Sequence, residues 1–429
     1  MFSGGQGQHG RVTEHPALLT DRYELTMLDG AVATGLADRR AVFEVFCRRL
    51  PPGRRFAVAA GQGRLARLLP TAQWDDGALA QVAPWVAPAT LTWLRGRVPS
   101  PAVSCFAEGE LIVPGSPVLT VEGSFGEGLL LETLVLSVLN ADTAVASAAA
   151  RVVLAAAGRP VLEMGSRRVH EQAAVAAARA CWLAGFSGTS NLQAGATYGI
   201  PTAGTAAHAY VLAHPSERAA FASQVAAQGP GTTLLVDTYE VLEGVRTAVE
   251  VAGPGLGAVR LDSGDLGPLA RQVRALLDDL GATTTRIVAT SDLDEHAVAA
   301  LSDAPVDVFG IGTSVATGSG APTAGLVYKL VEVEGDDGRM RPVAKRSTGK
   351  ATLGGRKHAW RSTDPEGRVV ELLTVGDAPA PADARPMQGP LVDDLDAART
   401  RCAAALLALP EVARDLSPGP PAWTAELLP

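Results

Sequence analysis

The 429-residue sequence has little of several features that mark particular classes of protein. It contains four cysteines, which are too scattered for a Cys-x-x-Cys metal site and too few for a disulfide framework: Cys47, Cys105, Cys181 and Cys402. Only 19% of the residues are charged and the net charge is −8. This balance disfavours non-specific binding to nucleic acid or anionic membranes, because both need clustered lysine and arginine. It is compatible with a local basic pocket for a small phosphate.

Long hydrophobic runs are also scarce. Residues 1–27 lack the apolar core of a signal peptide, and the alanine-rich stretch 144–157 is interrupted by Arg151 well short of a membrane span. We therefore expect a cytoplasmic protein, since a reducing compartment suits the free cysteines. With 47% apolar residues the chain can bury a large core, and its length favours two or three domains.

From about residue 160 the sequence alternates β-branched runs with amphipathic stretches, which predicts a chain of βα units around a parallel sheet. The expected strands are 159–166, 200–211, 232–239, 257–264, 285–292 and 306–313. The expected helices are 170–184, 216–227, 269–280 and 293–303. About six units favour a (β/α) barrel, and an open doubly wound sheet is the alternative. Polar and glycine residues follow each strand, where such folds build their active sites.

Two carboxylates follow the expected strand 257–264. Arg260, Asp262 and Asp265 lie around a glycine turn, where the carboxylates could hold ribose hydroxyls or a hydrated Mg²⁺. The alternative is a turn that only caps the next helix.

Two further segments favour anion binding. The turn that contains Gly310, Gly312 and Thr313 exposes successive backbone N–H groups, which would bind a phosphate unless the segment is a plain tight turn. No Gly-Lys-Ser/Thr follows it, so the segment is not a P-loop. Arg167 and Arg168 stand between a strand and a helix. A surface ion pair is the alternative there, but cations are unfavourable at a helix N-terminus, which favours a carboxylate or phosphate ligand.

His208 is surrounded by the small residues of 204–209, which leave its ring open to a substrate. A catalytic or phosphorylated histidine competes with a purely structural one. The histidines form no His-Glu-x-x-His or i, i+4 pair, so no zinc site is expected. Near the N-terminus, Tyr23 would either stack on a planar ligand or anchor a helix to the core.

These segments, taken in order, resemble the nicotinate phosphoribosyltransferase family over nearly the whole chain. The matching motifs are LLTDRYELTM (18–27), FEVFCRRLP (43–51), LEMGSRR (162–168), GFSGTSN (185–191), GTAAH (204–208), RLDSGDL (260–266), FGIGT (309–313), YKLVEV (328–333) and KRSTGK (345–350). The resemblance implies the irregular (β/α) barrel of the type II phosphoribosyltransferases and an α/β domain built from the N-terminal and part of the C-terminal region. We accordingly expect an N-terminal domain at 1–125, a catalytic barrel at 126–335 and a C-terminal region at 336–429 that partly packs on the first domain.

The resemblance also implies a reaction. Nicotinate and 5-phosphoribosyl 1-diphosphate would give nicotinate mononucleotide and diphosphate for NAD synthesis, with ATP as co-substrate and Mg²⁺ carried by the diphosphate near Asp262 and Asp265. His208 matches the histidine that the family phosphorylates from ATP. A homodimer is implied, in which Tyr23 of one subunit would stack on the pyridine ring in the other.

The remaining ligand contacts are carried over in the same way. Nicotinate would be held by Arg167, Thr205 and Arg260, and the ribose 5-phosphate by Gly310, Gly312 and Thr313. Met164 stands where many relatives have an aromatic residue, and a methionine packs more loosely on a ring. Ser190 stands where nicotinamide-using relatives have an aspartate, whose charge would repel nicotinate. The alternatives are a nicotinamide or quinolinate phosphoribosyltransferase and a catalytically silent, metabolite-binding homologue.

Overall fold

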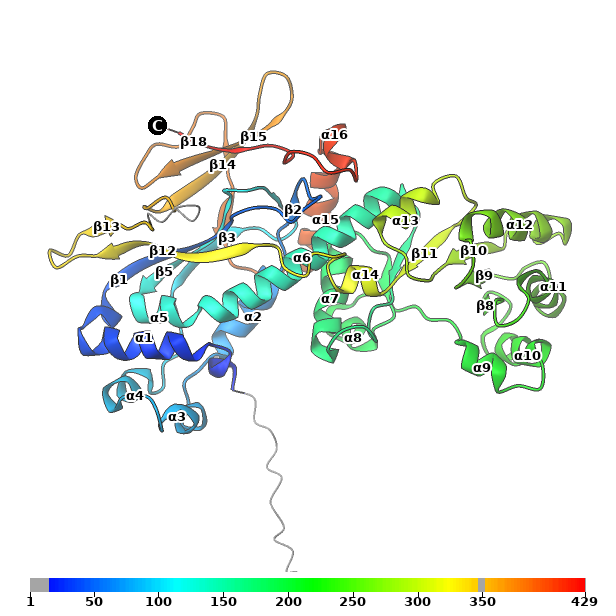
Figure 1. The fold of residues 1–429 in the computed structure, drawn as a ribbon, viewed down its shortest axis with the longest axis horizontal. Coiled ribbons are helices and arrows are strands. Elements are labelled where there is room, and N and C mark those ends of the chain that lie inside the picture. Colours follow the sequence, from blue (N-terminus) through cyan, green and yellow to red (C-terminus); the bar gives the residue numbers. More distant parts are fainter. Residues whose placement is uncertain (1–14, 346–351, 429) are drawn as a thin grey trace, which may run out of the picture.

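The structure, a computed structural model, describes residues 15–345 and 352–428. Two parts lie side by side in Figure 1, an α/β domain around an antiparallel sheet and a region built on a parallel sheet. The long helix α6 (Glu132–Ala156) runs from the first part to the second. Except for Lys345, the motif at 345–350 lies outside the described residues.

The first part contains a six-stranded sheet in the order β13-β12-β1-β5-β3-β17. Its strands are β1 (Arg40–Cys47), β3 (Ala102–Phe106), β5 (Pro117–Ser124), β12 (Leu326–Glu334), β13 (Met340–Pro342) and β17 (Gln388–Pro390). Strand β12 pairs antiparallel with β1, and the Tyr328 ring stacks on Phe43 with centroids 5.1 Å apart. Residues 326–334 therefore belong with this sheet, not with the barrel to which the sequence pattern assigns them.

The rest of the first part consists of short helices and two small sheets. The N-terminal helices are α1 (Arg22–Ala33), α2 (Gln62–Leu68), α3 (Asp76–Val82), α4 (Pro88–Leu94) and α5 (Phe125–Leu130), with 3-10 turns at Pro16–Leu18, Leu36–Asp38 and Leu69–Thr71. Strands β2 (Ala57–Val58) and β4 (Leu111–Ile112) pair with each other. The C-terminal elements are β14 (Lys357–Thr363), β15 (Val369–Val375), β16 (Arg385–Pro386), α15 (Leu395–Leu407), α16 (Glu411–Arg414) and β18 (Ala425–Leu427). Strands β14, β15, β16 and β18 form a sheet in the order β16-β14-β15-β18, beside the first one.

The second part is built on a six-stranded sheet in the order β7-β6-β11-β10-β9-β8, in which every neighbouring pair is parallel. The strands are β6 (Val161–Glu163), β7 (Gly188–Thr189), β8 (Thr233–Leu235), β9 (Ala258–Leu261), β10 (Arg286–Ala289) and β11 (Val308–Ile311). Within the described residues the edge strands β7 and β8 do not pair with each other, so the sheet is a half-barrel. Its strands are mostly buried, as parallel strands covered on both faces must be.

Helices surround this sheet and connect its strands. They are α7 (Glu171–Leu183), α8 (Leu192–Tyr198), α9 (His208–Leu212), α10 (Glu217–Gln228), α11 (Val241–Ala252), α12 (Leu266–Asp279), α13 (Glu295–Ala300) and α14 (Thr313–Ala316). The strand expected at 200–211 is wrong, because Thr202 makes only a single bridge to Thr189 and α9 begins at His208. Pro201 lacks a backbone donor and Gly204 weakens a strand, so the chain between α8 and α9 forms a loop.

Helix α6 is long and apolar enough to cross a membrane by length and composition alone, and 72% of its most apolar window is buried inside the fold. This burial is typical of the core helix of a soluble protein. Arg151, which interrupts the apolar stretch, is 7% exposed and donates its Nε–H to Glu295 at 3.0 Å. The apolar character of α6 is therefore accounted for by internal packing against neighbours such as α7 and α13.

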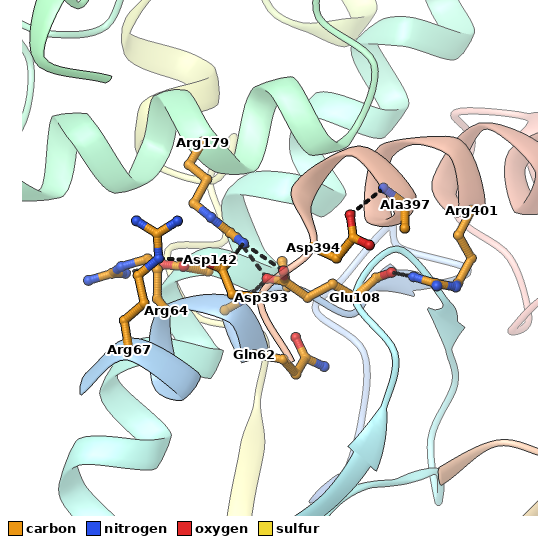
Figure 2. Close-up of polar contacts among 12 residues, drawn as sticks. Gln62, Arg64, Arg67, Glu108, Asp142, Arg179, Asp393, Asp394, Ala397 and Arg401 are labelled. Carbon is orange, nitrogen blue, oxygen red and sulfur yellow. Dashed lines mark hydrogen bonds and ion pairs between the residues drawn. The ribbon is translucent and has the colours of Figure 1, made fainter. Parts of the chain in front are cut away.

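A buried ion cluster joins the two parts (Figure 2). Arg179 of α7 is 1% exposed and donates two hydrogen bonds to Glu108, at 2.8 and 2.7 Å, and one to Asp393 at 2.9 Å. Arg64 of α2 pairs with Asp142 of α6 at 2.6 Å beside them. Burial of either charge alone would be costly, so the segments around residues 108, 179 and 393 are held together.

We predict that Arg179→Met lowers the free energy of unfolding by about 3–5 kcal/mol, because it leaves Glu108 buried without its cation. Urea unfolding followed by tryptophan fluorescence measures the change. Arg368, whose side chain is 68% exposed and pairs with Asp364 at 2.8 Å, supplies the control. Arg368→Met should cost about 0–1 kcal/mol, since exposed ion pairs are weak. Equal losses for the two variants would contradict a joining role for the cluster.

Candidate active site

A cavity of about 230 Å³ lies where the carboxyl ends of four neighbouring strands meet. Residues at or just after β6, β9, β10 and β11 line it, as expected for the ligand-binding end of a parallel sheet. These lining residues are Met164, Arg167, Arg168, Arg260, Asp262, Thr290, Ser291, Asp292, Gly310, Gly312 and Thr313. Most of them are polar, and three are arginines.

Arg260 is the best-fixed cation of the cavity. Its guanidinium donates to the hydroxyls of Thr290 and Thr205, each at 2.9 Å, and to the Asp262 carboxylate at 2.8 Å. Thr290 also donates its hydroxyl to Asp262. Partial burial acts to raise the pKa of Asp262, but the hydrogen bonds from Thr290 and Arg260 outweigh it and hold this pKa below its usual value. A charged arginine and a charged carboxylate therefore stand side by side with fixed geometry.

His208 lies beside this pair, at the first residue of α9. Its Nδ1 is 3.1 Å from the Thr238 hydroxyl, and its Nε2 is 3.8 Å from carboxylate oxygens of both Asp237 and Asp262. The Asp237 side chain is 1% exposed, and one of its oxygens accepts the Asp262 N–H at 2.9 Å and the Ser263 hydroxyl at 2.7 Å. The imidazole is 42% exposed, so the ring stays open to a reactant although these polar side chains orient it.

Most of the predicted site residues come together here. Six of them line the cavity: Arg167, Arg260, Asp262, Gly310, Gly312 and Thr313. Thr205 is bonded to Arg260, and His208 lies next to Asp262. The turn expected at 310–313 is wrong at its start, because Gly310 lies within β11 and only Gly312 lies between β11 and α14. Gly310 has no room for a side chain, since an added Cβ would lie 2.6 Å from Thr290 and 2.8 Å from the Met164 sulfur.

Besides Thr205 and His208, which contact lining residues, three further predicted residues lie outside the cavity lining. Asp265 is exposed and caps the N-terminus of α12 without a side-chain hydrogen bond. Ser190 follows β7, where its N–H donates to the Glu163 carbonyl at 2.8 Å. Tyr23 lies on α1 in the first part of the chain and is 46% exposed. Partial burial and the nearby charges of Glu132 and Glu24 raise the pKa of its phenol.

Several site residues were not singled out from the sequence. Asp237 and Thr238 follow β8, and Thr290, Ser291 and Asp292 follow β10. Their position after apolar strands was the only sequence feature that could have identified them as site residues. Their contacts with His208 and Arg260 depend on the fold. Ser291 has a φ of 104°, which a non-glycine residue rarely adopts and which is often found at functional sites.

Comparisons with known proteins identify the family of this chain. Residues 18–140 match the family model described as the nicotinate phosphoribosyltransferase (NAPRTase) N-terminal domain, and residues 160–352 match that of the nicotinate phosphoribosyltransferase (NAPRTase) family. The chain is 53% identical to nicotinate phosphoribosyltransferase pncB1 of Mycobacterium tuberculosis, over 96% of this chain and 95% of the relative. It is 36% identical to nicotinate phosphoribosyltransferase of Bacillus subtilis, over 82% of this chain and 74% of the relative.

A solved structure extends the likeness to the fold. The crystal structure of human nicotinic acid phosphoribosyltransferase superposes with a TM-score of 0.81 at 28% sequence identity, covering 95% of this chain and 97% of that chain. This match confirms the predicted combination of an irregular (β/α) barrel with an α/β domain. Because the family models, the relatives and the fold all agree, the chain belongs to the nicotinate phosphoribosyltransferase family.

Proposed function

We propose that the chain joins nicotinate to 5-phosphoribosyl 1-diphosphate, releasing diphosphate and forming nicotinate mononucleotide for NAD synthesis, with coupled hydrolysis of ATP. The observation that carries the proposal is the cavity that three arginines line together with Gly310 and Gly312. Both substrates are anions, so such a cavity suits them. The four cysteines are free and buried, which is consistent with a reducing, cytoplasmic location.

The residues divide the work by their positions. Arg260, fixed by Thr205 and Thr290, holds the carboxylate of nicotinate together with Arg167, while the N–H groups around Gly312 hold the 5-phosphate. The pyridine nitrogen forms a bond to ribose C1 as the bond from C1 to diphosphate breaks. The ionised Asp262 stabilises the positive charge that develops on the ribose in this step.

His208 links ATP to this transfer by accepting a phosphoryl group. Its exposed ring, held from behind by Thr238 and Asp237, is arranged as a nucleophile. The γ-phosphoryl group moves from ATP to a ring nitrogen with release of ADP, and water later cleaves the P–N bond to give phosphate.

The proposal includes Mg²⁺, which neutralises charge on the leaving diphosphate when it is bound. Among residues 15–345 and 352–428, no group of three or more histidine, cysteine, aspartate or glutamate side chains is arranged to hold a metal. We therefore assign the ion to diphosphate oxygens, with Asp262 and the exposed Asp265 as the nearby carboxylates. Carboxylate oxygens and retained waters are ligands that suit Mg²⁺.

We also propose a homodimer in which α1 of each subunit completes the other subunit's site. Tyr23 and Met27 stand four residues apart on α1 and are 46% and 41% exposed, and Leu19, just before the helix, is 52% exposed. Neighbouring exposed apolar side chains of this kind are typical of an interface. Within one chain, α1 lies in the first part and the cavity in the second.

The substrate assignment predicts a strong preference for the acid. With phosphoribosyl diphosphate, ATP and Mg²⁺ present, kcat/KM for nicotinate should exceed that for nicotinamide on the order of 100-fold, because the arginines would lose their charged partner. Chromatography of the mononucleotide products measures both rates. Equal use of nicotinamide, or preferred use of quinolinate, would contradict the assignment of nicotinate as the substrate. Absence of every product would indicate the silent homologue.

His208→Ala should abolish ATP hydrolysis and ATP stimulation while retaining a slow, ATP-independent synthesis of nicotinate mononucleotide, because Arg260, Asp262 and the glycine turn are untouched. Labelled ATP should leave an acid-labile, base-stable phosphate on the wild-type protein and none on the variant. His214→Ala is the matched control, since His214 follows α9 and its Nδ1 lies 2.8 Å from the Tyr210 carbonyl oxygen. ATP hydrolysis that persists in step with product in His208→Ala would disprove the phosphohistidine.

The shared site can be tested by mixing subunits. Tyr23→Ala and His208→Ala should each lose ATP-coupled synthesis as homodimers, whereas co-expressed subunits should regain about a quarter of the wild-type sites, since half of random dimers carry one intact site. Tyr23→Phe retains the ring and should stay active. If Tyr23→Ala is inactive but mixing restores nothing, or if a monomer is fully active, Tyr23 does not act across subunits.

A further inference from the structure

Glu163, the last residue of β6, is a buried carboxylate that the proposed reaction does not use. It is 1% exposed, and no arginine, lysine or histidine of the described residues pairs with it. One carboxylate oxygen accepts the hydroxyl hydrogen of Thr189, at the end of β7, and the other accepts the N–H of Gly165. A buried carboxylate that is held only by neutral donors is costly, so its presence calls for a specific reason.

These hydrogen bonds continue into the turn after β6, which lines the cavity, and into the turn after β7 beside it. The Thr189 hydroxyl oxygen accepts the Asn191 N–H at 3.0 Å, and the Asn191 amide donates to the Ser166 hydroxyl at 3.0 Å. The Ser190 N–H donates to the Glu163 carbonyl at 2.8 Å. Glu163 is thus the common acceptor for the turn after β6, which carries Arg167, and the turn after β7, which carries Ser190.

The turn after β6 has little freedom to move. A Cβ added to Gly165 would lie 2.7 Å from the Ala316 side chain and 3.0 Å from the Gly312 carbonyl oxygen. The backbone at Gly165 therefore lies directly against the glycine turn of the cavity. Any shift of Gly165 that follows the loss of its acceptor would be passed to Arg167, two residues later, because the packed side cannot absorb it.

We propose that Glu163 is a positioning residue that sets the separation of the Arg167 and Ser190 turns and thereby the affinity for the nicotinate carboxylate. The inference rests on the proposed function, in which Arg167 helps to hold the nicotinate carboxylate. Burial raises the pKa of Glu163 against the opposing effect of the Thr189 and Gly165 hydrogen bonds, which agrees with a group retained for its two acceptor oxygens.

The nicotinate carboxylate takes no part in bond making, so its contacts are about equally strong in the ground state and the transition state. Loss of such uniform binding raises KM and leaves kcat unchanged. A raised KM with an unchanged kcat distinguishes a positioning role from a general loss of folded protein, which would lower the apparent kcat and leave KM unchanged.

The test compares Glu163→Leu, Glu163→Gln and Thr189→Val by steady-state kinetics. Glu163→Leu should raise KM for nicotinate on the order of 10–100-fold, with kcat and KM for phosphoribosyl diphosphate changed less than about threefold. Glu163→Gln offers an acceptor and a donor in the same place and should recover most of the affinity. Thr189→Val should raise the same KM about 3–10-fold, and adding it to Glu163→Leu should have no further effect, because both act through one hydrogen bond.

Ser116→Ala is the matched control for Thr189→Val. Ser116 is fully buried and donates its hydroxyl to the buried Glu371 at 2.5 Å, in the first part of the chain and away from the cavity. It should lose stability and keep both KM values. If Glu163→Leu fails to fold, the outcome for Thr189→Val decides.

A fall in kcat without a change in KM for nicotinate, or additive effects in the double variant, would overturn the positioning role. Failure of wild-type protein to use nicotinate is a separate result, which would overturn the proposed function instead.

Discussion

The bidentate pairing of buried Arg179 with Glu108 is the interaction on which the relative placement of the two parts depends. Glu108 belongs to the turn between β3 and β4, Arg179 to α7 and Asp393 to the segment before α15, so three distant stretches of chain meet at one guanidinium. A buried charge without its partner is strongly unfavourable, which makes this meeting point specific. The same helix α7 begins at Glu171, so the cluster fixes the helix that directly follows the cavity-lining Arg167 and Arg168.

The arginines of the cavity differ in how they are held. Arg260 has three side-chain partners and a carbonyl contact at 3.2 Å with Ala206, so its guanidinium is already oriented when a ligand arrives. The side chains of Arg167 and Arg168 are exposed. Their position is set by the backbone just before them, which is closely packed at Gly165. A fixed cation favours electrostatic catalysis because no reorganisation is needed during reaction, whereas exposed cations can close on an anion as it binds. The cavity contains both kinds.

Local pattern predicts the barrel strands well because parallel strands buried on both faces read as short runs of branched apolar residues. Five of the six expected segments contain a strand, and the exception is 200–211. The strand that was not expected is β7, which is only Gly188–Thr189 and too short for any periodicity. Strand β12 was placed in the wrong part because its partner β1 lies far away in the sequence, with Val45 paired to Tyr328. The site residues that directly follow strands could be predicted from the sequence. The role of Asp237 could not, because it depends on a buried carboxylate lying close to His208, and local sequence does not indicate that contact.

The composition of the cavity lining also bears on how a pyridine ring would be held. Aromatic ligands are stabilised when both faces meet apolar or aromatic groups. Among the eleven lining residues Met164 alone has a large apolar side chain, so this chain offers one apolar wall and a polar remainder. A second wall has to come from elsewhere, and Tyr23 and Met27 of α1 are large side chains that their own chain leaves 46% and 41% exposed. The division of polar and apolar surface between the two parts is thus a physical reason for two copies to combine.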